Sequence, residues 1–109
     1  MPALNATSHE IPLGDVLKQI SIELVAIANT VNLVEETISR IACDGQANHM
    51  MVKDLQSIDV ISQSLRALAS FSMNVSQPIP AHWQVDVAQA TDRILLTDLA
   101  KRLTCIRPH

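Results

Sequence analysis

The chain has 109 residues, a formal net charge of −3 and 48% hydrophobic residues. This length favours a single domain, and the apolar content excludes a disordered tail. The eight Lys and Arg residues are scattered along the sequence, which argues against nucleic-acid binding through phosphate contacts. No apolar run is long enough to span a bilayer, and the N-terminus lacks a signal-peptide pattern. We therefore expect a cytoplasmic protein that binds neither nucleic acid nor membrane.

The composition favours an all-α fold. Phe71 and Trp83 are the only aromatic residues, so the core must be built from aliphatic side chains. Such a composition suits helix-on-helix packing better than a β-sandwich, whose strands favour aromatic and β-branched residues. The two glycines also leave little material for the tight turns of a hairpin-rich sheet.

The first predicted helix covers residues 12–43, after a flexible arm at residues 1–10. Pro12 suits the first turn of a helix, and Gly45 supplies a stop signal after Cys43. Apolar residues recur between these points at steps of three and four, which predicts an amphipathic helix. They are Leu13, Val16, Leu17, Ile20, Leu24, Ile27, Val31, Val34, Ile38 and Ile41.

Two further helices are predicted, at residues 47–73 and 81–104. Pro78 and Pro80 separate them, because proline cannot continue a helix. The second helix carries an apolar stripe made of Met51, Leu55, Ile58, Ile61, Leu65 and Leu68. The third carries Val87, Ala90, Ile94, Leu95, Leu99 and Leu103.

These helices predict one helical domain over residues 1–109. The short loop after the first helix makes the first two helices an antiparallel hairpin, along which the third helix returns. The third helix is shorter than the hairpin, so apolar surface is left over and we expect a homodimeric helical bundle. The alternative is that the third helix folds over the hairpin and completes the bundle within one chain. Cys43 and Cys105 would lie at the same end, where a disulfide is geometrically conceivable. A cytosolic setting favours two free thiols instead.

The second helix has an outward face that carries a specific pair of side chains. Asp59 and Gln63 are four residues apart, so they lie one above the other on a helix. The helical period places both away from the apolar stripe, which predicts that both are exposed. Gln56, Ser70 and the apolar Val60 share this face. Polar residues at this spacing are also common on ordinary solvated helix surfaces.

The segment Leu55–Leu65, LQSIDVISQSL, resembles the catalytic helix of the CheZ chemotaxis phosphatases. That family carries Asp-x-x-x-Gln on an exposed face of a long helical hairpin, within a dimeric four-helix bundle. The likeness of architecture extends over residues 12–73, and the small size is similar to the short CheT members. The chain departs from CheZ in being about half as long, without a clear partner-binding tail helix.

The resemblance implies a function in bacterial chemotaxis. The substrate would be a CheY-like response regulator that carries a phosphoaspartate and its own Mg²⁺, so this chain needs no cofactor. Gln63 would hold a water in line for attack, and Asp59 would pair with the active-site lysine of the receiver. Gln56, Val60 and Ser70 would bind the partner around this pair. The chain would then be a protein phosphoaspartate phosphatase.

Two other functions remain open from the sequence. The hairpin could be an adaptor that docks on a receiver or another chemotaxis protein without chemistry. His49 could alternatively make it a histidine phosphotransfer protein, although Lys53 and Asp54 do not match the spacing and small residue of that family. Cysteine and histidine spacing predicts no metal site.

Overall fold

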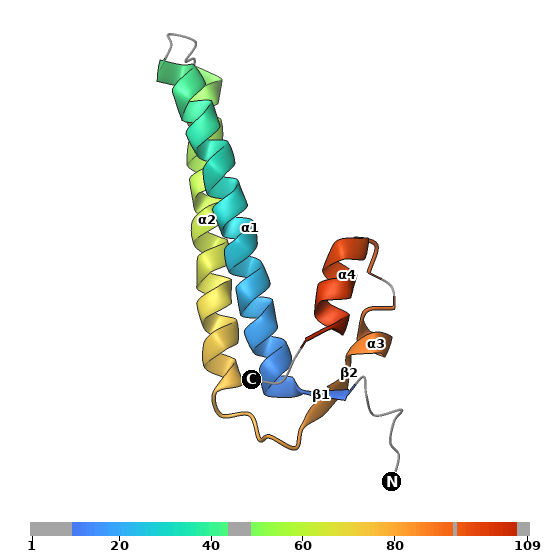
Figure 1. The fold of residues 1–109 in the computed structure, drawn as a ribbon. Coiled ribbons are helices and arrows are strands. Elements are labelled where there is room, and N and C mark those ends of the chain that lie inside the picture. The colour runs from blue at the N-terminus through green and yellow to red at the C-terminus, as the bar shows by residue number, and fades with distance from the viewer. Residues whose placement is uncertain (1–9, 44–48, 93, 107–109) are drawn as a thin grey trace. The chain divides into compact units, whose positions relative to one another are not determined.

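A computed structural model describes residues 10–43, 49–92 and 94–106 (Figure 1). The chain is mostly helical, as predicted, and two long helices pack against each other. The elements in order are β1 (Glu10–Pro12), α1 (Leu13–Ile41), α2 (His49–Ser76), β2 (Gln84–Asp86), α3 (Val87–Ala90) and α4 (Thr97–Thr104). Residues 1–9 of the predicted arm, the stop signal at Gly45 and the predicted helix start at residue 47 lie outside the described residues. The last residue of the predicted arm, Glu10, belongs to β1.

The predicted antiparallel hairpin of α1 and α2 is confirmed (Figure 1). α1 starts one residue later than predicted because Pro12 belongs to β1, and a π-helical turn at residues 42–43 follows its last residue, Ile41. α2 runs three residues further than predicted, to Ser76, whose hydroxyl donates to the Met73 carbonyl at 2.5 Å. The break before Pro78 lies where the prolines predict it.

Small residues form the contact line between the two helices, which we call the seam. Ala28 of α1 is fully buried, and Ser62 and Ala69 of α2 are each 3% exposed. Ser21 and Ala28, like Ser62 and Ala69, are seven residues apart, a spacing that keeps them on one helix face. Since small side chains let two helix axes approach closely, this seam supports tight packing between α1 and α2.

The predicted apolar stripe of α2 is wrong in part. Leu55, Ile58 and Leu65 are half-buried beside the seam, but Ile61 and Leu68 are 51% and 53% exposed. The reason is that Ser62 and Ala69 occupy the positions in direct contact with α1. The larger side chains one residue earlier are therefore turned toward the edge of the hairpin.

The predicted helix at residues 81–104 is wrong. Residues 81–82 form a turn, β2 follows at Gln84–Asp86, and only the short α3 and α4 are helical. β2 pairs antiparallel with β1, so that Val85 lies opposite Ile11. The Asp86 side chain then caps α3 by accepting a hydrogen bond from the Gln89 backbone N–H at 3.1 Å.

α3 ends at Ala90, and Thr91 is its C-terminal cap residue. The Thr91 hydroxyl donates to the Val87 carbonyl at 2.8 Å, and the Thr91 backbone N–H donates to the same carbonyl at 3.0 Å. Leu95, which the pattern counted as part of an apolar face, is 95% exposed between α3 and α4. Strand pairing and local caps therefore outweigh the helical spacing of apolar residues in this segment.

The structure divides the chain into two compact units, where the sequence predicts one domain. One unit combines residues 1–20 with 72–109, and the other is the hairpin segment 21–71. In the first unit, Ile11, Val87 and Ile106 form a buried apolar cluster. The backbone N–H of Leu13 donates to the Trp83 carbonyl at 2.7 Å, which joins the start of α1 to the segment before β2.

Cys43 and Cys105 are both free, as expected from the sequence, and both are exposed rather than half-buried. The expectation that they lie at one end rested on a continuous helix over residues 81–104. Because that helix is absent, the expectation loses its basis.

By length and composition alone, α1 is long and apolar enough to cross a membrane. This differs from the expectation that no apolar run is long enough. The same properties are found in core helices of helical bundles. Its polar residues Asn29 and Asn32 share one edge of the hairpin, so α1 is amphipathic rather than apolar all round.

Candidate functional site

The two edges of the hairpin differ in chemistry. Positions one and four residues after Ala28 are Asn29 and Asn32, and the same offsets from Ser62 give Gln63 and Arg66. Because equal offsets on an antiparallel helix pair lie on one edge, these four residues share an edge with Asp59. We call this edge the polar side.

Hydrogen bonds between the helices confirm this assignment. The Ser62 hydroxyl donates to Asn32 Oδ1 at 2.7 Å, and Arg66 Nη2 donates to Asn29 Oδ1 at 2.9 Å. Both bonds join α1 to α2 on the polar side. They also set the register, because they place residue 32 level with residue 62.

Asp59 and Gln63 are both exposed, as predicted, and they form a pair within the polar side. Gln63 Nε2 donates to Asp59 Oδ2 at 2.7 Å. A charge-assisted bond of this length restricts the orientation of the amide. The pair therefore presents a carboxylate and an oriented amide to solvent, one helical turn apart.

The other predicted site residues surround this pair on the exposed surface of α2. Gln56, Gln63 and Ser70 are spaced at seven residues, so they follow one line along the helix, and all three are exposed. Val60 is 61% exposed beside this pair. An exposed apolar side chain next to polar groups is compatible with a surface that a protein partner covers.

Sequence reasoning missed Asn29, Asn32 and Arg66. The two asparagines interrupt the apolar pattern of α1, which was the available signal. Their connection with α2 depends on the register between the helices, which a single-helix pattern does not contain. The side chain of His49, named above for phosphotransfer, lies outside the described residues.

The opposite edge of the hairpin is apolar. Aliphatic residues lie one position before Ala28, Ser62 and Ala69, and on α1 they recur every seven residues after Ile27; each is about half exposed. This apolar side consists of Ile27, Val34, Ile41, Ile61 and Leu68. The asymmetry separates a polar candidate site from a surface suited to apolar packing.

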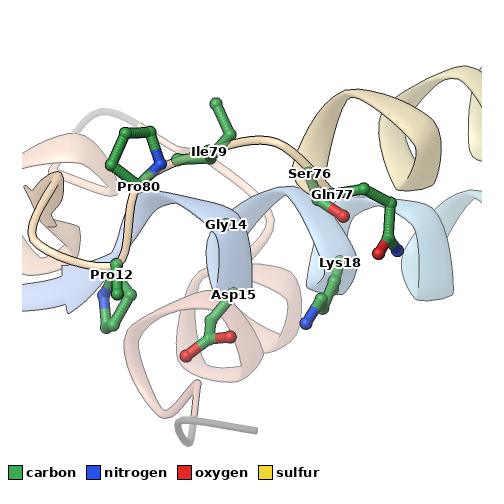
Figure 2. A pocket seen from close by; sticks show the side chains of 9 residues that line it. Pro12, Gly14, Asp15, Lys18, Ser76, Gln77, Ile79 and Pro80 are labelled. Atoms are coloured by element: carbon green, nitrogen blue, oxygen red, sulfur yellow. The ribbon is translucent and has the colours of Figure 1, made fainter.

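A cavity of about 320 Å³ lies elsewhere, between the first turns of α1 and the segment after α2 (Figure 2). Asp15, Lys18 and Gln77 supply its charged and amide groups, whereas Ile79 and Pro80 supply apolar surface. A Cβ atom added at Gly14 would lie 3.4 Å from the Ser76 carbonyl oxygen, so the wall is closely packed there. The mixture of one carboxylate and one ammonium group does not define a ligand class.

Metal binding has no support in the described part of the chain. No group of three or more His, Cys, Asp and Glu residues is arranged there to hold an ion. The candidate site therefore consists of the polar side, with Asp59 and Gln63 at its centre.

Comparison with known proteins gives a family but no described activity. No curated protein and no solved structure matches the chain. A family model described as Domain of unknown function (DUF8776) matches residues 9–107, which is nearly the whole chain. The chain therefore belongs to that family.

Proposed function

We propose that this protein is a CheZ-like phosphatase that acts on a phosphorylated, CheY-like response regulator in the bacterial cytoplasm. The observation that carries the proposal is the exposed, hydrogen-bonded pair of Asp59 and Gln63 on one face of a long hairpin. The spacing of this pair and the hairpin that presents it both match the resemblance described above.

Gln63 would supply the positioning of water. Its bond to Asp59 uses one amide hydrogen, and its carbonyl oxygen can accept a hydrogen bond from a water molecule. The water oxygen would bond to phosphorus while the bond to the aspartyl oxygen breaks. Inorganic phosphate and the free receiver carboxylate are the products. Such catalysis by positioning needs no general base on this chain.

Asp59 would set the register of docking. The receiver holds Mg²⁺ and a lysine that neutralise the phosphoryl charge. When Asp59 pairs with that lysine, its bond to Gln63 can break, which frees both amide hydrogens of Gln63 at the moment of docking. Gln56, Val60 and Ser70 would contact the receiver around the pair.

The exposure of Val60 is equally compatible with a second function. An aliphatic residue on the docking face would strengthen binding whether or not chemistry follows, so the hairpin could be a non-catalytic adaptor. The two functions share the surface and differ only in the role of Gln63.

We also propose that the apolar side is covered by a second copy of the chain. Ile27, Val34 and Ile41 repeat at seven residues, the period on which long helices supercoil together. This stretch is about 21 Å long at 1.5 Å per residue, whereas α4 has eight residues and would cover only about 12 Å. Within the described part of the chain, the hairpin has the length and the seven-residue period that would cover the apolar side, so a second hairpin fits it.

The deciding experiment is a phosphate-release assay with a purified CheY-like receiver, Mg²⁺ and a small-molecule phosphodonor. We expect the wild-type protein to speed loss of the phosphoryl group, and Gln63→Ala to reduce the rate about 100-fold, as for misplaced catalytic groups in general. Gln84→Ala, which removes an exposed amide from β2 and lies outside the polar side, is the control and should retain most of the rate. Binding without any acceleration by the wild type would reject the phosphatase and favour the adaptor.

A further inference from the structure

Arg66 lies on the polar side, three residues after Gln63, and its guanidinium is held by the other helix. Its Nη2 atom donates to Asn29 Oδ1 at 2.9 Å, while the residue itself is exposed. A guanidinium carries five N–H donors in a planar fork, and this bond uses one of them. Since the asparagine amide is neutral, the bond orients the guanidinium without cancelling its charge.

Asp59 and Arg66 form a charged axis along the polar side. They are seven residues apart on α2, so they follow nearly the same line at a separation of about 10 Å. This distance is too long for a direct ion pair. The polar side therefore presents a negative and a positive group to the same partner surface.

We propose that Arg66, oriented by Asn29, is the second charged contact of the docking face and pairs with a surface carboxylate of the receiver. This inference rests on the proposed function, in which Asp59 pairs with the receiver lysine. The receiver would carry the carboxylate about 10 Å from that lysine. Arg66 would position the receiver and take no part in the chemistry. Its bond to Asn29 holds the guanidinium in place on the polar side.

A second contact of opposite charge restricts how the receiver can turn on the polar side. A receiver held only at Asp59 could turn about that contact, and Gln63 would face the phosphoryl group in few of the orientations. With Arg66 as the second contact, a reversed receiver would oppose like charges at both positions. The charged axis therefore selects the orientation in which Gln63 meets the phosphoaspartate.

The test separates docking from chemistry by steady-state kinetics on the phosphorylated receiver. Arg66→Gln should raise KM about threefold to fivefold at low salt, as expected for an exposed ion pair, and should leave kcat unchanged. The effect should shrink as ionic strength rises, because salt screens exposed charges. Asn29→Ala keeps the charge but removes the orienting bond, so it should raise KM by a smaller factor.

Lys101→Gln is the control for the lost charge. Lys101 is an exposed cation in the last turn of α4, and it belongs to neither the seam nor the polar side. Its removal changes the net charge equally, so it should leave KM near the wild-type value. Arg66→Lys restores the charge without the fork and should recover part of the loss.

The outcomes distinguish this inference from the proposed function. If Gln63→Ala abolishes turnover while Arg66→Gln and Lys101→Gln behave alike, the phosphatase stands and the role of Arg66 is wrong. A fall in kcat without a change in KM would also overturn it. If the wild type binds the receiver without turnover, the same ratios are expected in Kd, and equal Kd values for the two variants overturn the inference. Absence of any receiver binding overturns both proposals.

Discussion

The polar and apolar sides of the hairpin differ although both flank the same seam. On the polar side, Ser62 and Arg66 are hydrogen-bonded to Asn32 and Asn29 of the facing helix. On the apolar side, aliphatic residues such as Val34 and Leu68 remain about half exposed. The polar side is thus complete within one chain, whereas the apolar side leaves surface that packing against another chain would bury.

The difference suggests a division of tasks along the hairpin. Polar groups that are hydrogen-bonded to neighbouring side chains can stay exposed to water at little cost in free energy, so they suit a surface that binds a partner only transiently. Apolar surface gains free energy whenever it is buried, which suits a lasting contact. This difference is the reason for proposing that the receiver binds the polar side and that a second copy of the chain binds the apolar side.

Val34→Lys should have the largest effect, because it tests whether a second copy covers the apolar side. A lysine in the middle of the apolar side would have to be buried without a partner if two copies pack there, which disfavours the dimer by several kcal/mol. We expect light scattering to give the dimer mass for the wild type and the monomer mass for this variant. Leu33→Lys is the control, since Leu33 is exposed on the neighbouring outer surface of α1. A monomeric wild type at micromolar concentration would contradict the dimer.

Ala69→Leu should have the next largest effect, because it tests the seam between the two sides. Ala69 is 3% exposed where α2 faces α1, so a larger side chain has no space without separating the helices. Overpacking of this kind costs about 1–3 kcal/mol in the free energy of unfolding. Urea denaturation would measure the loss. Ala67→Leu, at an exposed position of the same helix, should leave the unfolding midpoint nearly unchanged.

Ser62→Ala should have a smaller effect, confined to the polar side. The change removes the hydroxyl that donates to Asn32 Oδ1 at 2.7 Å and leaves a small side chain in the seam. Loss of one such bond costs about 1 kcal/mol. Ser64→Ala provides a comparison at an exposed residue two positions away. Equal unfolding free energies for the two variants would show that the bond to Asn32 adds no stability.

The long helices and the exposure of the Asp59–Gln63 pair could be predicted from the sequence, because both depend on the period of a single helix. The seam could not. On α2 the apolar pattern combines residues beside the seam, such as Leu65, with residues of the apolar side, such as Leu68. The stripe therefore points between two surfaces, and the small residues that touch α1 contribute little to it.

Residues 81–104 could not be predicted from helical spacing for a different reason. The pairing of Val85 with Ile11 joins residues that are 74 positions apart, so no local pattern contains it. Asp86 does carry a local signal for a helix start, and its side chain caps α3. The helical spacing of the apolar residues suggested one longer helix instead.

Asp59→Ala should have the smallest effect on stability, and this separates function from folding. Asp59 and Gln63 are exposed, and a hydrogen bond between side chains one turn apart stabilises a helix by about 0.2–0.5 kcal/mol. The unfolding midpoint should therefore barely move, in contrast to that of Ser62→Ala. Receiver binding should weaken in the same samples, because the contact to the receiver lysine is lost. A large loss of stability would instead mean that the pair is structural, and that the polar side is built for the hairpin rather than for a partner.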